Sequence, residues 1–247
     1  MERITDAVKH LIIVNVLFFI ATQMYGNQMY EWFSLWFPKN ENFQLWQIVS
    51  HMFMHGGAMH ILFNMYALWA FGTPLERMWG KNKFFFFYFS AGIGAAIIHT
   101  GVNYYYFNDG LNALISSGLS ESEVIDIITK GKYSPDWYNV ASRNTIDNFL
   151  SSYNTPAVGA SGAIYGILVA FGMSYPNTEL FLMFIPVPIK AKFFIPVIIA
   201  LDLFSGVTGY SIFGSGIAHF AHVGGALFGF LMMWYWKKNQ FNGNRWN

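Results

Sequence analysis

Apolar residues in this chain gather into long runs that short polar stretches separate. Six runs approach the roughly 20 residues that a helix needs to cross a bilayer. They cover about residues 11–25, 57–72, 83–107, 156–175, 193–210 and 217–236. A further apolar run, residues 180–189, has about half that length and contains Pro186 and Pro188, so we interpret it as an interfacial loop. The pattern predicts an all-α polytopic membrane protein, a single domain over residues 1–247 built as a bundle of six transmembrane helices.

Composition agrees with this pattern and excludes several classes of function. Hydrophobic residues make up 54% of the chain and charged residues 11%, whereas soluble domains carry about 25% charged residues. The net charge of +1 gives no electrostatic footprint for a nucleic-acid partner. The absence of cysteine excludes disulfides, cysteine nucleophiles and cysteine-ligated metals.

The basic residues favour one orientation in the membrane. With the N-terminus inside, ten of the 14 Lys and Arg residues fall on the inner side, as the positive-inside rule requires. We therefore predict six spans with both termini in the cytoplasm. The first run follows Arg3 and Lys9, and a cleaved signal peptide is the alternative to a retained anchor. Residues 21–24 lack a small-x-small cleavage site, which favours the anchor.

Two predicted outer loops are long. The first, about residues 26–56, is rich in aromatic residues, which are favoured at the membrane interface. The second covers residues 108–155. Within it Ser120 is followed three residues later by Glu123, a capping-box signature that predicts a short helix on the outer surface.

A few polar side chains lie inside the predicted spans, where such groups are costly and usually functional. His60 and Asn64 lie in the second span, Ser161 in the fourth and His222 in the sixth. All three spans run from outside to inside in the predicted topology. At 1.5 Å per residue, the four residues lie within roughly 5–10 Å of the outer end. Three separate helices thus bring them to one layer of the membrane.

Glycine spacing predicts which helices pack together. Gly162 and Gly166 are four residues apart in the fourth span, and Gly225 and Gly229 are four apart in the sixth. Small residues at this spacing let two helix backbones approach closely. We therefore expect the fourth and sixth spans to be in contact, so that Ser161 can meet an imidazole across the gap.

These residue types suit nucleophilic acyl transfer. His222 would accept the proton of the Ser161 hydroxyl as general base. His60, Asn64 and the Ser161 amide would stabilise an oxyanion, and Tyr165, one turn beyond Ser161, would stack on His222. Counted about ten residues into the fifth span, Asp202 falls too deep to take part, so we predict a Ser–His dyad. We interpret Asp202 and His99 as helix-packing groups and His219 as structural.

The motifs that carry these residues resemble those of the rhomboid family of intramembrane serine proteases. They are "GASG" at residues 159–162 with Tyr165, "HILFN" at residues 60–64 and "AHVGGALFG" at residues 221–229, in the family's order. "LERMWG", residues 75–80, is similar to the family's glutamate-containing turn. The resemblance covers nearly the whole chain apart from the second outer loop.

The resemblance implies cleavage of transmembrane segments of other membrane proteins, without metal or other cofactor. It carries over Ser161 as nucleophile, His222 as base, and His60, Asn64 and the Ser161 amide as the oxyanion hole. Gly159, Gly162, Gly225 and Gly229 act as supporting residues. By analogy the fifth span with residues 211–216 forms a gate, and the bacterial cytoplasmic membrane is the default location. One departure is Trp46-Gln47, where the family commonly has Trp-Arg.

Two other classes of function stay open. A small transporter or proton channel also needs intramembrane His, Asn and Asp, but its sites are expected near the midplane between internal repeats. A non-proteolytic relative that acts as a binding chaperone would have lost the serine or histidine. His51 and His55, four residues apart, suggest a metal site, which the absence of a HExxH motif and of nearby carboxylates disfavours.

Overall fold

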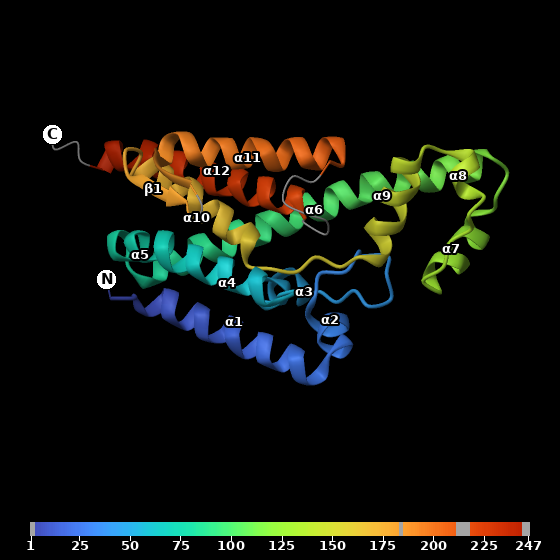
Figure 1. Cartoon of the computed structure of the whole chain (residues 1–247), viewed down its shortest axis with the longest axis horizontal. Helices are drawn as coiled ribbons and strands as arrows, with labels where there is room; N and C mark the ends of the chain where they lie inside the picture. The colour runs from blue at the N-terminus through green and yellow to red at the C-terminus, as the bar shows by residue number, and fades with distance from the viewer. Residues whose placement is uncertain (1–2, 183–184, 211–217, 244–247) are drawn as a thin grey trace.

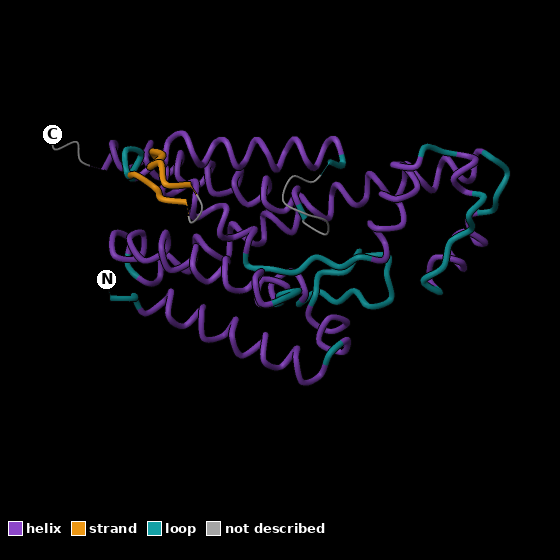
Figure 2. Tube along the Cα trace, in the orientation of Figure 1, coloured by secondary structure: helices purple, strands orange, loops and turns teal. Residues whose placement is uncertain are grey.

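The computed structural model describes residues 3–182, 185–210 and 218–243. These residues are mostly helical, with one short pair of strands (Figures 1 and 2). A helix accounts for most of each of the six long apolar runs. The helices are α1 (Asp6–Tyr25), α4 (Ala58–Ala67), α6 (Lys81–Ser116), α10 (Ser161–Ser174), α11 (Ala191–Thr208) and α12 (His219–Gly243). α1 begins and α12 ends at the same end of the bundle (Figure 1).

Membrane-spanning character is clearest for part of this set. Three of the described helices, α1, α6 and α11, are long and apolar enough to cross a membrane, and α10 is a shorter apolar helix. On α1 the side chains of Ile13, Leu17 and Ile20 are about half exposed, at 49%, 59% and 50%. Because such apolar exposure is unfavourable in water, this face of α1 suits contact with lipid.

The second apolar run extends further than its sequence predicts. After α4 the chain continues through a π-helical segment, η2 (Leu68–Gly72), into α5 (Thr73–Trp79). Glu76, which the resemblance places in a turn, lies within α5, and the turn itself comes at Gly80 with φ +78°. The Glu76 carboxylate accepts hydrogen bonds from the backbone N–H groups of Ala7 and Val8, at 2.8 and 2.9 Å. It thereby caps the start of α1, whose first N–H groups have no intrahelical partner.

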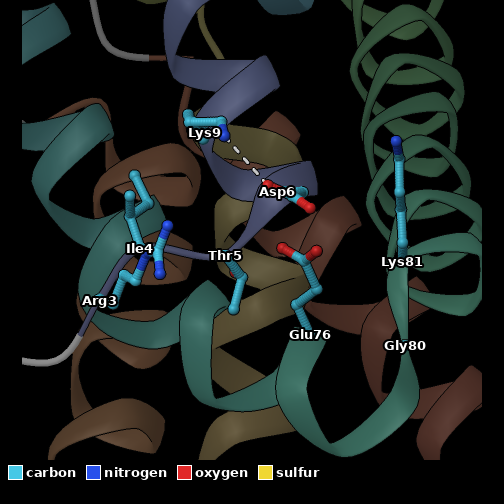
Figure 3. Close-up of a pocket in the computed structure, with 8 residues that line it drawn as sticks. All are labelled: Arg3, Ile4, Thr5, Asp6, Lys9, Glu76, Gly80 and Lys81. Atoms are coloured by element: carbon cyan, nitrogen blue, oxygen red, sulfur yellow. Dashed lines mark hydrogen bonds and ion pairs between the residues drawn. The ribbon is translucent and has the colours of Figure 1, made fainter.

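A hollow of about 540 Å³ lies beside this cap (Figure 3). Arg3, Lys9 and Lys81 line it together with Asp6 and Glu76. Lys9 is paired with Asp6 at 3.0 Å. The hollow lies at the N-terminal end of α1.

The fourth run begins as extended chain, so α10 starts five residues later than predicted. Leu35 and Ala157 exchange two backbone hydrogen bonds of 2.9 Å as an isolated antiparallel bridge. The Gly159 N–H donates to the carbonyl of His51 at 2.9 Å. Ser161 is therefore the first residue of α10, and the first outer loop fixes its position.

The apolar run at residues 180–189 is a β-hairpin rather than an irregular loop. Strand β1 (Glu179–Leu182) pairs antiparallel with β2 (Ile185–Lys190), with Glu179 opposite Lys190. Pro186 and Pro188 lie in β2. A two-stranded sheet tolerates proline because each strand keeps one edge free of ladder hydrogen bonds.

The predicted second outer loop, residues 108–155, is largely helical. α6 continues to Ser116 without interruption, and it is followed by α7 (Glu121–Thr129), α8 (Trp137–Val140) and α9 (Arg143–Asn154). The Ser120 side chain accepts from the Glu123 N–H at 3.2 Å, which confirms the predicted N-terminal cap. We call residues 107–154 the outer module; it projects beyond the bundle along the extension of α6 (Figure 1).

Large apolar side chains fill the outer module. Phe107 and Phe149 are fully buried, with ring centroids 5.3 Å apart, and Trp137 packs against Phe149 at 6.1 Å. A β-carbon on Gly110 would come within 2.4 Å of the Phe149 side chain, so α6 and α9 meet closely at this glycine.

The first outer loop contains α2 (Asn27–Phe33), α3 (Gln47–Ser50) and a 3₁₀ turn, η1 (His51–Phe53). Its centre is the fully buried side chain of Gln47. The Gln47 Nε2 donates to the carbonyls of Glu31 and Asn42 at 2.9 and 2.8 Å. Its Oε1 accepts from the N–H groups of Trp36 and Gln44 at 3.3 and 3.2 Å. A neutral amide, which both donates and accepts, here satisfies four backbone groups.

Candidate active site

The predicted contact between the fourth and sixth spans is confirmed at the glycines. A β-carbon on Gly225 would lie 1.8 Å from the Gly162 carbonyl oxygen, and one on Gly229 would lie 2.6 Å from the Gly166 Cα. Real β-carbons do not approach other atoms so closely, so only glycine fits at these positions. The backbones of α10 and α12 therefore touch directly, which brings short side chains on the two helices within reach of each other.

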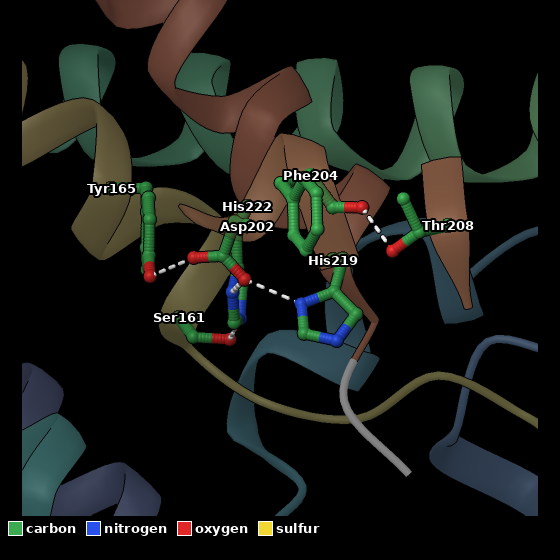
Figure 4. A network of polar contacts seen from close by, with 7 residues as sticks. All are labelled: Ser161, Tyr165, Asp202, Phe204, Thr208, His219 and His222. Atoms are coloured by element: carbon green, nitrogen blue, oxygen red, sulfur yellow. Dashed lines mark hydrogen bonds and ion pairs between the residues drawn. The ribbon is translucent and has the colours of Figure 1, made fainter. Parts of the chain in front are cut away.

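Ser161 and His222 meet across this contact, as the sequence predicts. The Ser161 Oγ and the His222 Nε2 are 2.8 Å apart, a hydrogen-bond distance for a nucleophile and its base. The ring of Tyr165 stacks on the His222 ring with centroids 4.3 Å apart and an interplanar angle of 13°, which confirms the predicted stacking. Figure 4 shows the three side chains at the junction of α10 and α12.

The prediction that Asp202 lies too deep to take part is wrong. Its carboxylate is fully buried on α11, and Oδ1 lies 3.1 Å from the His222 Nδ1 and 2.6 Å from the His219 Nδ1. The Tyr165 hydroxyl donates to the other oxygen, Oδ2 (Figure 4). His219, interpreted from the sequence as structural, thus shares a carboxylate oxygen with His222.

Depth explains the error. In the predicted topology the fifth span runs from inside to outside, so the relevant distance is the one from its outer end. α11 ends at Thr208, six residues beyond Asp202, which is about 9 Å along a helix. The contacts place Asp202 at the level of Ser161 and His222, and counting from the C-terminal end of the fifth span would have found it.

The three donors of the predicted oxyanion hole are Asn64, His60 and the Ser161 amide. Asn64 is buried, and its amide nitrogen has no hydrogen-bond partner among the described residues. The Nδ1 of His60 accepts a long, 3.4 Å bond from the Gly56 N–H, which leaves Nε2 as the protonated nitrogen of a neutral ring. The Ser161 N–H stands at the N-terminus of α10, where backbone donors have no intrahelical partner.

Gly159 brings His60 and Ser161 to the same place. Its φ is +125°, a conformation that other residues rarely adopt. A β-carbon there would lie 2.9 Å from the His60 Nε2 and 3.3 Å from the Ser161 Oγ. The bare backbone of Gly159 therefore leaves room for the imidazole of His60 next to the serine.

The other histidines are held separately. His51 is buried and its Nδ1 donates to the Gln47 carbonyl at 2.8 Å. His55 is fully buried, neither ring nitrogen has a partner in the described structure, and its ring packs edge-on against His60 at 5.0 Å. Burial lowers the pKa of both His51 and His55 to about 4. His99 contacts Asn103 on its own helix at 3.1 Å.

Across residues 3–182, 185–210 and 218–243, no three His, Asp or Glu side chains are grouped so that they could hold a metal ion. The site brings together a hydroxyl, an imidazole bonded to it and, among the described residues, an amide donor without a partner, which are groups that acyl transfer requires. Residues 211–216, the predicted gate loop, lie outside the described residues.

Comparison with known proteins establishes the family. The Rhomboid domain model matches residues 42–122 and 139–239, most of the chain. The chain belongs to the rhomboid family. The family match leaves out residues 123–138, which carry most of α7 and the start of α8 in the outer module.

Relatives named as rhomboid proteins match the chain over about three quarters of its length or over a shorter segment. "Rhomboid protein 1, mitochondrial" of Saccharomyces cerevisiae is 26% identical over 191 residues, which are 77% of this chain and 42% of that protein. "Presenilin-associated rhomboid-like protein, mitochondrial" of Rattus norvegicus is 29% identical over 184 residues, 74% of this chain and 35% of that one. The "Rhomboid protease GluP" of Bacillus subtilis is 40% identical over 52 residues, 21% of this chain and 10% of that one. The chain thus spans less than half the length of these relatives.

Proposed function

We propose that this rhomboid is an intramembrane serine endopeptidase that cleaves transmembrane segments of other membrane proteins. One observation carries the proposal: the Ser161 hydroxyl lies 2.8 Å from the His222 Nε2. The buried amide nitrogen of Asn64, which has no partner among the described residues, supplies a donor for the same reaction. A hydroxyl that bonds only its own helix would not need these surroundings. The match to a relative named as a protease supports the same reaction class.

The first half of the reaction forms an acyl-enzyme. As the Ser161 Oγ attacks the peptide carbonyl carbon, its proton moves to the His222 Nε2 and the carbonyl π electrons move to the oxygen. His60, Asn64 and the Ser161 N–H donate hydrogen bonds to that oxyanion, each worth roughly 2.7–4 kcal/mol when well placed. The C–N bond then breaks, and the Nε2 proton goes to the leaving amine.

The second half returns the enzyme to its starting state. Water attacks the ester carbonyl while His222 takes its proton, and the C–O bond to Ser161 breaks as the proton passes back to Oγ. No cofactor takes part in this scheme. Gly159, Gly162, Gly225 and Gly229 support it by letting the reacting groups approach.

The proposal places the protein as a bundle of six transmembrane helices, with α10 and α12 carrying the site. We propose that membrane lipid surrounds the exposed apolar faces, that both termini are cytoplasmic and that the substrate is a transmembrane protein. The predicted bacterial inner membrane gains no support from the relatives matched over three quarters of the chain, since those are named as mitochondrial.

The non-proteolytic alternatives explain less of the site. A binding chaperone has no need for a hydroxyl bonded to an imidazole, and a transporter site is expected near the membrane midplane, whereas Ser161 begins its helix. Both alternatives predict a serine of ordinary reactivity, whereas a protease requires an activated serine.

A fluorophosphonate probe tests the proposal directly because it labels only activated serines. We expect the purified, detergent-solubilised protein to be labelled, and Ser161→Ala and His222→Ala to remain unlabelled while they melt within a few degrees of the unmodified protein. Loss of the nucleophile or base in a serine protease lowers kcat by about 10⁶-fold. Labelling that persists in Ser161→Ala, or no labelling of the folded unmodified protein, would refute the proposal.

A further inference from the structure

We infer that Asp202 is a positioning residue of this active site, so that Ser161 and His222 work as part of a Ser–His–Asp triad. This inference rests on the proposed function and assigns a role to a buried carboxylate that a Ser–His dyad leaves unexplained. Asp202 comes from α11, a third helix, and is fully buried.

The bond to the His222 Nδ1 sets the tautomer of the base. A carboxylate only accepts hydrogen bonds, so the 3.1 Å contact with Oδ1 requires a proton on Nδ1. A neutral ring then has a lone pair on Nε2, the nitrogen that faces Ser161 at 2.8 Å. The same carboxylate lies next to the positive charge that the ring gains when it accepts the serine proton, which stabilises that charge.

Two further donors hold the carboxylate itself in place. The His219 Nδ1 bonds Oδ1 at 2.6 Å, and the Tyr165 hydroxyl bonds Oδ2. Tyr165 also stacks on the His222 ring, so one side chain restrains both the base and its carboxylate partner. An unpaired carboxylate would be very costly at this depth, and these contacts account for its burial.

Because Asp202 lies on α11, the hydrogen bond that orients His222 depends on how α11 packs against α10 and α12. α10 carries the nucleophile and α12 carries the base, whereas α11 contributes the carboxylate. The outward side of α11 is apolar and exposed, with Phe193 at 60% and Val207 at 69%. Any displacement of α11 from α10 and α12 therefore removes the partner of the His222 Nδ1 while Ser161 and His222 stay together.

The Asp202→Asn variant tests this role because it keeps the size of the side chain and removes its charge. The new amide can donate a hydrogen bond to the His222 Nδ1, which favours the tautomer that carries its proton on Nε2. In that tautomer Nε2 cannot accept the proton of Ser161. We expect the maximal rate of fluorophosphonate labelling to fall by about 10²- to 10⁴-fold, with half-saturation by the probe changed less than about twofold. We expect Asp202→Glu to recover part of the rate and His219→Gln to lose less than Asp202→Asn.

Ser205→Ala is the matched control. Ser205 lies one turn from Asp202 on α11, is 1% exposed, and its hydroxyl has no partner in the described part of the chain. We expect it to be labelled at the rate of the unmodified protein. Equal losses in Ser205→Ala and Asp202→Asn would overturn the positioning role in favour of a general need for α11 packing.

A spectroscopic readout keeps the inference testable if Asp202→Asn does not fold. In ¹⁵N-histidine NMR spectra of the unmodified protein, with His222 assigned by comparison with His222→Ala, we expect Nδ1 to be protonated and Nε2 unprotonated. The opposite tautomer would overturn the inference. If labelling depends on Ser161 but proceeds equally fast in Asp202→Asn, the inference fails and the protease proposal stands. No labelling of the folded unmodified protein would overturn both.

Discussion

The candidate active site and the outer module are built in opposite ways. Around Ser161, helices touch through glycine backbones, and the side chains between them are polar, small or stacked. In the outer module, α6 and α9 meet through large aromatic rings, among them Phe107 and Phe149, both fully buried. Among the described residues, the first region keeps a donor without a partner at Asn64, whereas the cluster of the second consists of aliphatic and aromatic side chains.

The comparison separates a region suited to the proposed reaction from a region suited to stability. A buried polar group without a partner reduces stability, and a role in a reaction is one reason for keeping it. Burial of aromatic rings, as in the outer module, contributes mainly to stability. Substitutions in the two regions should therefore separate the two properties.

Phe149→Ala should cause the largest loss of stability, because it removes a fully buried ring at the centre of the outer module. Truncation of a buried phenylalanine costs about 3–5 kcal/mol. We expect chemical denaturation followed by tryptophan fluorescence to show this loss, since Trp137 lies beside Phe149, while Ser161 labelling by fluorophosphonate is unchanged.

Asn144→Ala provides the control for this change, since Asn144 is exposed on the same helix. It should leave both properties unaltered. A Phe149→Ala protein that stays folded in the bundle yet loses labelling would show that the two regions are not separable.

Asn64→Ala should produce the converse result. Loss of an oxyanion donor lowers the rate of acyl transfer by about 10²–10³-fold, or roughly 2.7–4 kcal/mol. The melting temperature should stay the same or rise, because a buried amide nitrogen without a partner disappears. Labelling kinetics and a thermal melt on one sample measure both effects.

Leu62→Ala is the matched comparison, as Leu62 is 56% exposed on the same helix. A rate loss in Asn64→Ala no greater than in Leu62→Ala would contradict the oxyanion role of Asn64.

Acid should destabilise the first outer loop by a smaller amount. Burial lowers the pKa of His51 and His55 from 6.5 to about 4 in the folded protein. The unfolded chain therefore binds more protons between these values, so stability is highest above pH 6.5, falls as the pH drops towards 4, and levels off below 4. Between pH 7 and 5.5 we expect a loss of about 1 kcal/mol for each histidine.

Denaturation curves across this range would measure the slope. His55→Leu should make it shallower, because Leu has no proton to bind. An unchanged slope would exclude His55 as a source of the effect.

Sequence patterns predict much of the bundle because local composition determines it. The lengths of the apolar runs locate the helices, and the glycine spacing at Gly162 and Gly225 predicts the contact of α10 with α12. Together these two patterns predict from the sequence alone that Ser161 lies near His222.

Features that depend on distant partners are not predicted. α10 begins at Ser161 because Ala157 pairs with Leu35, and no local pattern records that pairing. Gln47 hydrogen-bonds backbone groups that surround it in space, and its own position in the sequence does not reveal them. The helix α9 is stabilised by contact with the extension of α6, although Ser142 marks its start by accepting from the Thr145 N–H at 3.1 Å.

The attachment of Ser161 to the first outer loop limits the sequence changes that this protein can accept during evolution. Its main links are backbone bonds, two between Leu35 and Ala157 and one from Gly159 to His51. These bonds do not depend on the identity of the side chains at Leu35 and Ala157, but both side chains are buried. Replacements of similar size that accept an extended conformation should therefore leave Ser161 in place. Insertions and deletions between Leu35 and His51 are different, because they would shift the register that places Ser161. We expect natural variation here to alter the kind of residue more readily than the number of residues.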